Sequence, residues 1–286
     1  MGICASHHIA STIGDAFQHS LDTLRQPVLS LSPNGTDFTF LNDKQSKRAF
    51  NWLFAGSQVL GGLALVLVTK WMNNYEGGFI WGDPVRTFNY HPVFNIISVV
   101  LLGEAVLVYR VFHNKGKRFS KTLHVIMMTM VTASSMVASK AIYDTKVLNK
   151  IPHAMSLHSW VGLAAILGIG GQYAFAFACF VCPTLPLRIR QLYMPFHQAG
   201  GMWFFATLAL NVGMGIAQRA AWHHTCWTKG HKLCGQQIIS NLLGVTIFLY
   251  ASTVLILVAN PRWKRSRLPE EVRPAIETKV LEEVSI

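Results

Sequence analysis

The chain has 286 residues, of which 51% are hydrophobic and only 13% are charged, and its formal net charge is +12 at pH 7. Its apolar residues form runs of about twenty, the length that crosses a bilayer core of roughly 30 Å. This composition predicts a polytopic membrane protein surrounded by lipid. The sequence does not show the interleaved aromatic and basic residues that would indicate nucleic-acid binding.

The first expected region is an N-terminal segment, residues 1–47, which precedes the first apolar run. Its length and acidic residues are unlike a cleaved signal peptide, whose charged start would lie near residue one. Gly2 fits the acceptor of a myristoylation pattern, with Cys4 available for palmitate, and this is held as a hypothesis. Asn34 begins a glycosylation sequon that would be used only in a lumen, and the charge pattern described below outweighs it.

Six apolar segments follow, and each is long enough to cross the membrane as a helix. They are residues 50–71, 92–112, 122–142, 157–180, 192–217 and 238–259. We therefore expect an all-α fold, with one transmembrane domain over residues 48–266. Residues 267–286 are charged and poor in aromatics, which predicts a flexible tail.

Basic residues predict the orientation of these segments. They gather in the loops on one side: Lys44, Lys47 and Arg48, then residues 110–121, then Arg188 and Arg190, then residues 262–267. By the positive-inside rule this side is cytoplasmic, and an even number of spans puts both termini there. Whether the membrane belongs to a vesicle, an endolysosome or the plasma membrane stays open.

Four histidines, His91, His124, His158 and His197, lie at or just inside the N-terminal ends of four different apolar segments. Because successive spans alternate in direction, His91 should meet His158 toward the outer face, and His124 should meet His197 toward the cytoplasm. Strongly polar side chains within a span usually face a polar interior or a cofactor. Neutral imidazole is a good axial ligand of haem iron, so the pattern predicts two b-type haems, one per pair.

Other haem or metal arrangements fit the sequence less well. No C-x-x-C-H motif occurs, which excludes covalent haem attachment. No span carries two histidines about fourteen residues apart, which argues against the arrangement of respiratory cytochrome b. A non-redox transporter, in which the histidines bind a transition metal or only pack, leaves their distribution over two faces unexplained.

Two longer motifs carry a family resemblance in register with these histidines. The stretch His91-Pro92 with residues 103–112 resembles the span-two signature of the cytochrome b561 family, and residues 156–163 resemble its span-four signature. The resemblance covers about residues 48–266. It implies a bundle of four central helices holding two non-covalent, bis-histidine b haems. It also implies electron transfer from cytoplasmic ascorbate to monodehydroascorbate or ferric iron on the other side, and, in many members, a homodimer.

The resemblance also assigns roles to residues near the expected haems. Near the cytoplasmic haem it matches two basic residues, Arg110 and Lys264, and for ascorbate binding it matches three more, Lys117, Lys121 and Arg190. Near the outer haem it matches His153, Ala154, Met155, Ser156 and Gln218.

On the outer side the chain departs from the family pattern. Members commonly carry a histidine soon after span three and an Asn-x-Tyr before Ser-Leu-His, whereas this chain has Lys146, His153 and Met155 at those places. The ascorbate site is therefore better supported than monodehydroascorbate as acceptor. A ferric chelate is an alternative, with His153, Lys146 and Lys150 as a basic approach surface.

Glu104 and the cysteines complete the candidate residues. A carboxylate within a span should be neutral, paired or functional, so Glu104 is either a hydrogen-bonded structural acid or a proton acceptor coupled to ascorbate oxidation. Cys226 and Cys234 lie in a predicted outer loop, where a local disulfide and free thiols are equally open. Cys179 and Cys182 are expected to be packed or free thiols.

Overall fold

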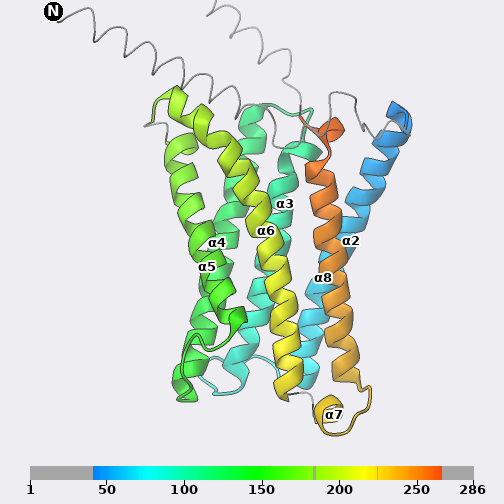
Figure 1. Ribbon diagram of the computed structural model, residues 1–286, viewed down its shortest axis with the longest axis vertical. Helices are drawn as coiled ribbons and strands as arrows, with labels where there is room; N and C mark the ends of the chain where they lie inside the picture. The colour runs from blue at the N-terminus through cyan, green and yellow to red at the C-terminus, as the bar shows by residue number, and fades with distance from the viewer. Residues whose placement is uncertain (1–40, 183–184, 224, 266–286) are drawn as a thin grey trace, which may run out of the picture. The chain divides into compact units, whose positions relative to one another are not determined.

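The structure is a computed structural model that describes residues 41–182, 185–223 and 225–265. Gly2, Cys4, Asn34 and the expected tail, residues 267–286, lie outside these residues. The chain divides into two compact units, Met1–Ala49 and Phe50–Ile286, and all four candidate histidines belong to the second. In the described part of the chain all regular structure is helical (Figure 1).

Six long helices make up this structure, joined by short turns. They are α2 (Asp43–Tyr75), α3 (Tyr90–Val111), α4 (Lys117–Leu148), α5 (Leu157–Ala176), α6 (Leu187–His223) and α8 (Gly235–Ala259). Shorter pieces are η1 (Arg86–Asn89), a π-helical turn η2 (Phe177–Val181) that continues α5, α7 (Thr225–Thr228) and η3 (Pro261–Trp263). All six long helices are long and apolar enough to cross a membrane, where η1 is counted with α3 and η2 with α5. This confirms the predicted all-α fold and its six spans.

Three of the long helices, α2, α4 and α6, extend at both ends beyond the apolar segments that predicted them. α4 begins at Lys117 and α6 at Leu187, well before the predicted starts at residues 122 and 192. Arg, Lys and Gln residues at these starts have good helix propensity, so the helix continues beyond the apolar stretch. His124 and His197 consequently lie about two to three turns inside their helices, and not in the first turn.

The core of the second unit forms where α2, α3 and α8 meet and where α6 covers them. Tyr250 of α8 is fully buried, and Phe205 of α6 packs on its ring with centroids 6.2 Å apart. Gly61 of α2 lies against the same ring, since a Cβ there would be 3.3 Å from Tyr250 Cε2. Large apolar side chains such as Phe248 lie on the outside, as expected for a surface that faces lipid tails.

Consecutive central helices run in opposite directions. In Figure 1, α3 and α5 begin at the lower end of the view, whereas α4 and α6 begin at the upper end. α3 packs closely along α4, and α5 along α6, while α4 and α5 approach each other at few points. Residues at the starts of alternate helices are therefore brought to the same end.

Candidate functional site

His91 and His158 face each other at one end of the central helices. Their ring centroids lie 6.2 Å apart with ring planes at 89°. His91 Nδ1 donates to the carbonyl oxygen of Ala138 in α4 at 3.0 Å, and His158 Nδ1 donates to that of Asn211 in α6 at 3.0 Å. Because a carbonyl only accepts, these hydrogen bonds place the proton on Nδ1 and leave Nε2 unprotonated, and at His91 this Nε2 lies 3.4 Å from Asn95 Nδ2.

His124 and His197 form a second pair at the opposite end. Their ring centroids lie 6.0 Å apart with ring planes at 83°. His124 Nδ1 donates to the carbonyl oxygen of Ala105 in α3 at 2.8 Å. The amide of Gln172 in α5 lies 3.3 Å from His197 Nδ1 and donates to the His197 carbonyl at 3.1 Å. Both histidine pairs expected from helix direction are thus brought together.

The geometry of the pairs fits axial ligation of one metal by each pair. A metal–imidazole bond is about 2 Å long, so two rings that flank one metal have centroids roughly 6 Å apart. Ligating histidines usually donate their other ring N–H to a carbonyl or carboxylate, as three of these four do. In the described residues no group of three or more His, Cys, Asp or Glu could hold a metal ion. Two imidazoles could hold a metal whose remaining ligands come from a planar group such as haem.

Local sequence explains why His158 is held so firmly. Ser156 caps α5 by accepting a hydrogen bond from the Ser159 amide at 3.3 Å, which fixes the start of the helix two residues before His158. Gly215 of α6 lies directly against the imidazole, because a Cβ at this position would be 2.8 Å from His158 Cε1. Gly162 of α5 lies similarly close to Asn211 of α6, because a Cβ at Gly162 would be 2.8 Å from Asn211 Nδ2.

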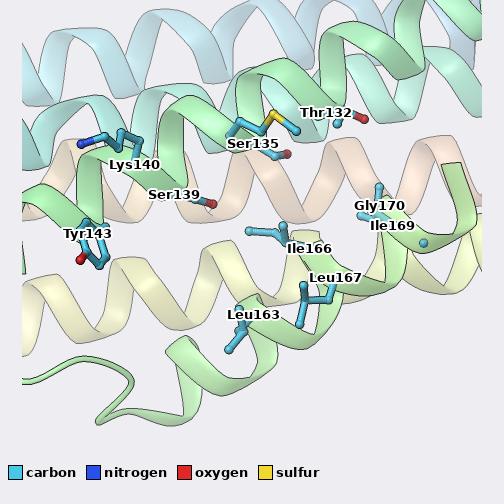
Figure 2. A pocket seen from close by; sticks show the side chains of 12 residues that line it. Thr132, Ser135, Ser139, Lys140, Tyr143, Leu163, Ile166, Leu167, Ile169 and Gly170 are labelled. Carbon is cyan, nitrogen blue, oxygen red and sulfur yellow. The ribbon is translucent and has the colours of Figure 1, made fainter. Parts of the chain in front are cut away.

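A cavity of about 660 Å³ opens where α4 and α5 diverge (Figure 2). Its wall is mostly apolar, from residues such as Leu163 and Ile166, with the hydroxyls of Thr132, Ser135 and Ser139 along the α4 side. Gly170 and Gly171 border it, and a Cβ on either would meet nothing within 4 Å. None of the four histidines lines this cavity.

The cations predicted for ascorbate lie at the end of the His124–His197 pair. Lys121 Nζ donates to the carbonyl oxygen of Phe180, whose ring lies 5.8 Å from that of His197. Arg190 is partly buried, and its Nε has no hydrogen-bond partner among the described residues. Lys117 is exposed in the first turn of α4.

The two basic residues assigned to the cytoplasmic haem differ in environment. The Arg110 guanidinium donates to the carbonyl oxygens of Asn260, at 3.3 Å, and of Val258, and so ties the end of α3 to the end of α8. Lys264 is exposed just after η3. In the structure Arg110 thus has an evident anchoring role.

The residues predicted beside the outer haem form the connection between α4 and α5 and the end of α6. His153 stacks on Tyr143 of α4 with ring centroids 5.0 Å apart, and Tyr143 lines the cavity. Ala154 has a φ of +53°, and Met155 is 74% exposed. Gln218 is half-buried near the end of α6.

Glu104 faces α2 and α8 and not the histidine pairs. Its Oε1 accepts from Gln58 Nε2 at 2.9 Å and from the Tyr250 hydroxyl at 3.4 Å. The same hydroxyl lies 2.9 Å from the Val100 carbonyl, so its single proton is shared between that carbonyl and the Glu104 carboxyl. These contacts suit a structural acid. Glu104 is also the residue before Ala105, whose carbonyl oxygen accepts the hydrogen bond that orients His124.

The connection between α6 and α8 contains a disulfide between Cys226 and Cys234, one of the two arrangements that the sequence left open. Cys179 is buried and Cys182 is exposed, and both are free thiols. The C-x-x-C pair is therefore not joined.

Sequence reasoning did not select several polar residues that hold the pairs. Gln172 and Asn211 are uncharged polar residues within apolar spans, and that rarity is the signal that could have found them. Gly215 and the ion pair of Arg219 with Glu76 carried no motif. Their importance comes from contacts between helices that lie far apart in the chain.

Six spans with one histidine pair at each end of the central helices define a helical membrane protein built to place two matching sites across a bilayer. A family model described as eukaryotic cytochrome b561 matches residues 90–223. A CYB561 homologue of Caenorhabditis elegans is 49% identical over 244 residues, which is 82% of this chain and 92% of the relative.

More distant relatives agree. The transmembrane ascorbate-dependent reductase CYB561 of Sus scrofa is 30% identical over 237 residues, covering 82% of this chain and 92% of the relative. The plasma membrane ascorbate-dependent reductase CYBRD1 of Mus musculus is 28% identical over 230 residues, covering 79% and 78%. The chain belongs to the cytochrome b561 family, a family of transmembrane oxidoreductases, which confirms the resemblance seen in the sequence.

Proposed function

We propose that this protein moves electrons one at a time from ascorbate on the cytoplasmic side, through two bis-histidine b haems, to an acceptor on the other side. The observation that carries the proposal is the presence of two histidine pairs at opposite ends of the central helices, with ring centroids 6.2 and 6.0 Å apart. Ascorbate as donor rests on the names of the relatives CYB561 and CYBRD1.

The chemistry is a balanced one-electron exchange. The ascorbate monoanion loses one electron and one proton and becomes monodehydroascorbate. Each haem, when bound, supplies a reversible one-electron carrier. On the far side either ferric iron takes the electron and becomes ferrous, or monodehydroascorbate takes an electron and a proton and returns to ascorbate.

The chain's own residues orient the carriers and attract the donor. Hydrogen bonds to Ala138, Asn211 and Ala105 fix the imidazole orientation, so that Nε2 would be the atom that holds the haem iron. At the His124–His197 end, Lys121 and Arg190 supply positive charge for the ascorbate anion. The buried Nε of Arg190 is a donor still in need of an acceptor, which is what an ascorbate oxygen offers.

A ferric chelate is the second candidate acceptor, and the residues of the α4–α5 connection favour it. His153 is exposed to solvent and stacks on Tyr143. Lys150 is exposed just before it in the chain, and Lys146 is partly exposed at the end of α4. Such a surface attracts anionic iron chelates. Supplying each acceptor in turn to vesicles loaded with ascorbate, and comparing rates in Lys146→Gln/Lys150→Gln, separates the two.

The proposed sidedness puts both termini in the cytosol, with the His124–His197 pair near the cytoplasmic face. The proposed domain plan is a cytosolic segment over residues 1–47, the transmembrane domain over 48–266 and a cytosolic tail over 267–286. Protease digestion of sealed, right-side-out vesicles tests this plan, because cleavage of either terminus from outside would contradict it.

The first experiment is the absorption spectrum of the purified protein, oxidised and then reduced by ascorbate, with a pyridine haemochrome count. We expect two b haems per chain and reduction of both by ascorbate. Protein without haem, or haem that ascorbate does not reduce, would overturn the proposal.

A further inference from the structure

A buried ion pair lies beside the His91–His158 pair. Glu76 follows the end of α2, and both Glu76 oxygens are met by the guanidinium of Arg219 near the end of α6. Gln236, at the start of α8, donates to Glu76 Oε1 at 2.8 Å. The Glu76 and Arg219 side chains are only 7% and 15% exposed, so water screens them little.

This ion pair is one packing layer from His91. The Arg219 guanidinium lies over the Phe88 ring at 4.5 Å from its centroid, and the Phe88 ring lies 6.0 Å from that of His91. The backbone carbonyl of Glu76 accepts from the buried side chain of Asn89 at 2.8 Å, two residues before His91. Both ends of the ion pair are thus linked to the start of α3.

The same ion pair is connected to His158 through α6. Gly215 and Arg219 are four residues apart on α6, so they lie one above the other on the same helix face. Gly215 leaves room for the His158 ring, and Arg219 reaches Phe88 beneath His91. One face of α6 therefore carries both Gly215, which lies against His158, and Arg219. The Arg219 guanidinium lies over Phe88, the ring that neighbours His91.

We propose that Glu76 and Arg219 form a charge-compensating pair beside the haem held by His91 and His158, so that loss of either partner alone shifts the midpoint potential of that haem. The inference rests on the proposed function. Both residues are positioning residues, since neither touches a histidine directly. Their partial burial gives their charges more effect than those of the exposed lysines on the same side of the membrane.

The sign of the effect follows from the charge that reduction adds. An electron on the haem is stabilised by a nearby positive charge and destabilised by a nearby negative one. With both partners present the two charges largely cancel. Removing Glu76 leaves the guanidinium and should raise the potential, whereas removing Arg219 leaves the carboxylate and should lower it.

Redox titration of the purified, haem-loaded protein tests this inference with Glu76→Gln and Arg219→Gln. We expect the potential of the His91–His158 haem to rise in the first variant and to fall in the second, with the other haem nearly unchanged. The midpoint potential of the double variant should lie close to that of the parent, because the two substitutions together remove one negative and one positive charge. If Arg219→Gln does not fold, Arg219→Lys, which keeps the charge, should titrate near the parent.

Asp83→Asn is the matched control. Asp83 is paired with exposed Arg86 at 3.0 Å, and hydrogen bonds from Arg86 lower the pKa of its carboxyl to about 2. The substitution therefore removes a full charge, but the Asp83 and Arg86 side chains are 26% and 38% exposed and better screened by water than Glu76 and Arg219, so we expect no shift of either haem.

The outcomes separate the inference from the proposed function. Opposite shifts confined to one haem support the inference. Shifts of the same sign in both variants, or none, would show that the ion pair only holds α2 and α6 together. Haem absent from the parent protein would instead defeat the proposed function, and the inference with it.

Discussion

Gly215 lies against the imidazole of His158, so closely that a Cβ on Gly215 would be 2.8 Å from His158 Cε1 and 3.3 Å from both ring nitrogens. Real side chains essentially never approach this closely, and the neighbour here is a ring already held by a hydrogen bond to Asn211. The absence of a side chain at residue 215 therefore helps to define where the imidazole lies.

The first prediction concerns this contact. Gly215→Ala should displace the His158 ring, weaken one of the two haem sites and leave the other intact. Gly213→Ala is the matched control, because it lies on the same helix and its Cβ would meet nothing within 4 Å. The haem content and reduced spectrum of both variants are the measurement. Equal haem content in the two variants would contradict the steric argument.

The positions of the four histidines and the direction of the helices were sufficient to predict which histidines meet. His91 and His158 share one end because α3 and α5 run in the same direction, and that follows from counting spans. The sequence did not show that Gly215 contacts His158, or that Arg219 pairs with Glu76. Those contacts depend on the rotation of each helix about its axis, which apolar runs all round a membrane helix leave undetermined.

The contacts of the candidate cations also depend on how each helix is rotated about its axis. The family resemblance matched Lys121 and Arg190 to ascorbate-binding positions, and in the structure Lys121 donates to the Phe180 carbonyl while Arg190 lies in the first turn of α6. Charge alone did not predict that Arg110 would donate to the carbonyls at the end of α8. A cation near a helix end can satisfy the free carbonyls of another helix, and the sequence does not reveal which helix that is.

The second prediction concerns the order of electron transfer between the pairs. His124→Ala should abolish fast reduction by ascorbate from its own side. His158→Ala should leave the other haem reducible by ascorbate but block transfer onward. Stopped-flow absorbance on vesicles with ascorbate on one side follows both steps. His113→Ala, at an exposed histidine on the same end as His124, is the control and should behave as the parent. Loss of both haems in each variant would show that the two sites are not independent.

The third prediction concerns the donor site. Arg190→Gln removes a partly buried cation whose Nε lacks a partner in the described part of the chain. A hydrogen bond to a charged group contributes about 1.5–3 kcal/mol, so KM for ascorbate should rise roughly ten- to a hundredfold, with little change at saturating ascorbate.

Arg188→Gln is the control for Arg190→Gln. Arg188 lies two residues earlier on α6 and is exposed, so its loss should change KM by no more than about twofold. Equal effects of the two substitutions would indicate general attraction by surface charge in place of a defined contact, and rising salt should then abolish both effects.

The fourth prediction distinguishes the two roles of Glu104. If its carboxyl accepts the proton that ascorbate releases, Glu104→Gln should change the pH dependence of haem reduction by ascorbate. Tyr250→Phe removes one hydrogen bond to that carboxyl and keeps the carboxyl itself, so it serves as the control. The measurement is the initial rate of reduction across a range of pH. An unchanged pH dependence in Glu104→Gln, together with a lower Tm in both variants, would leave Glu104 as a structural acid that joins α3 to Gln58 and Tyr250.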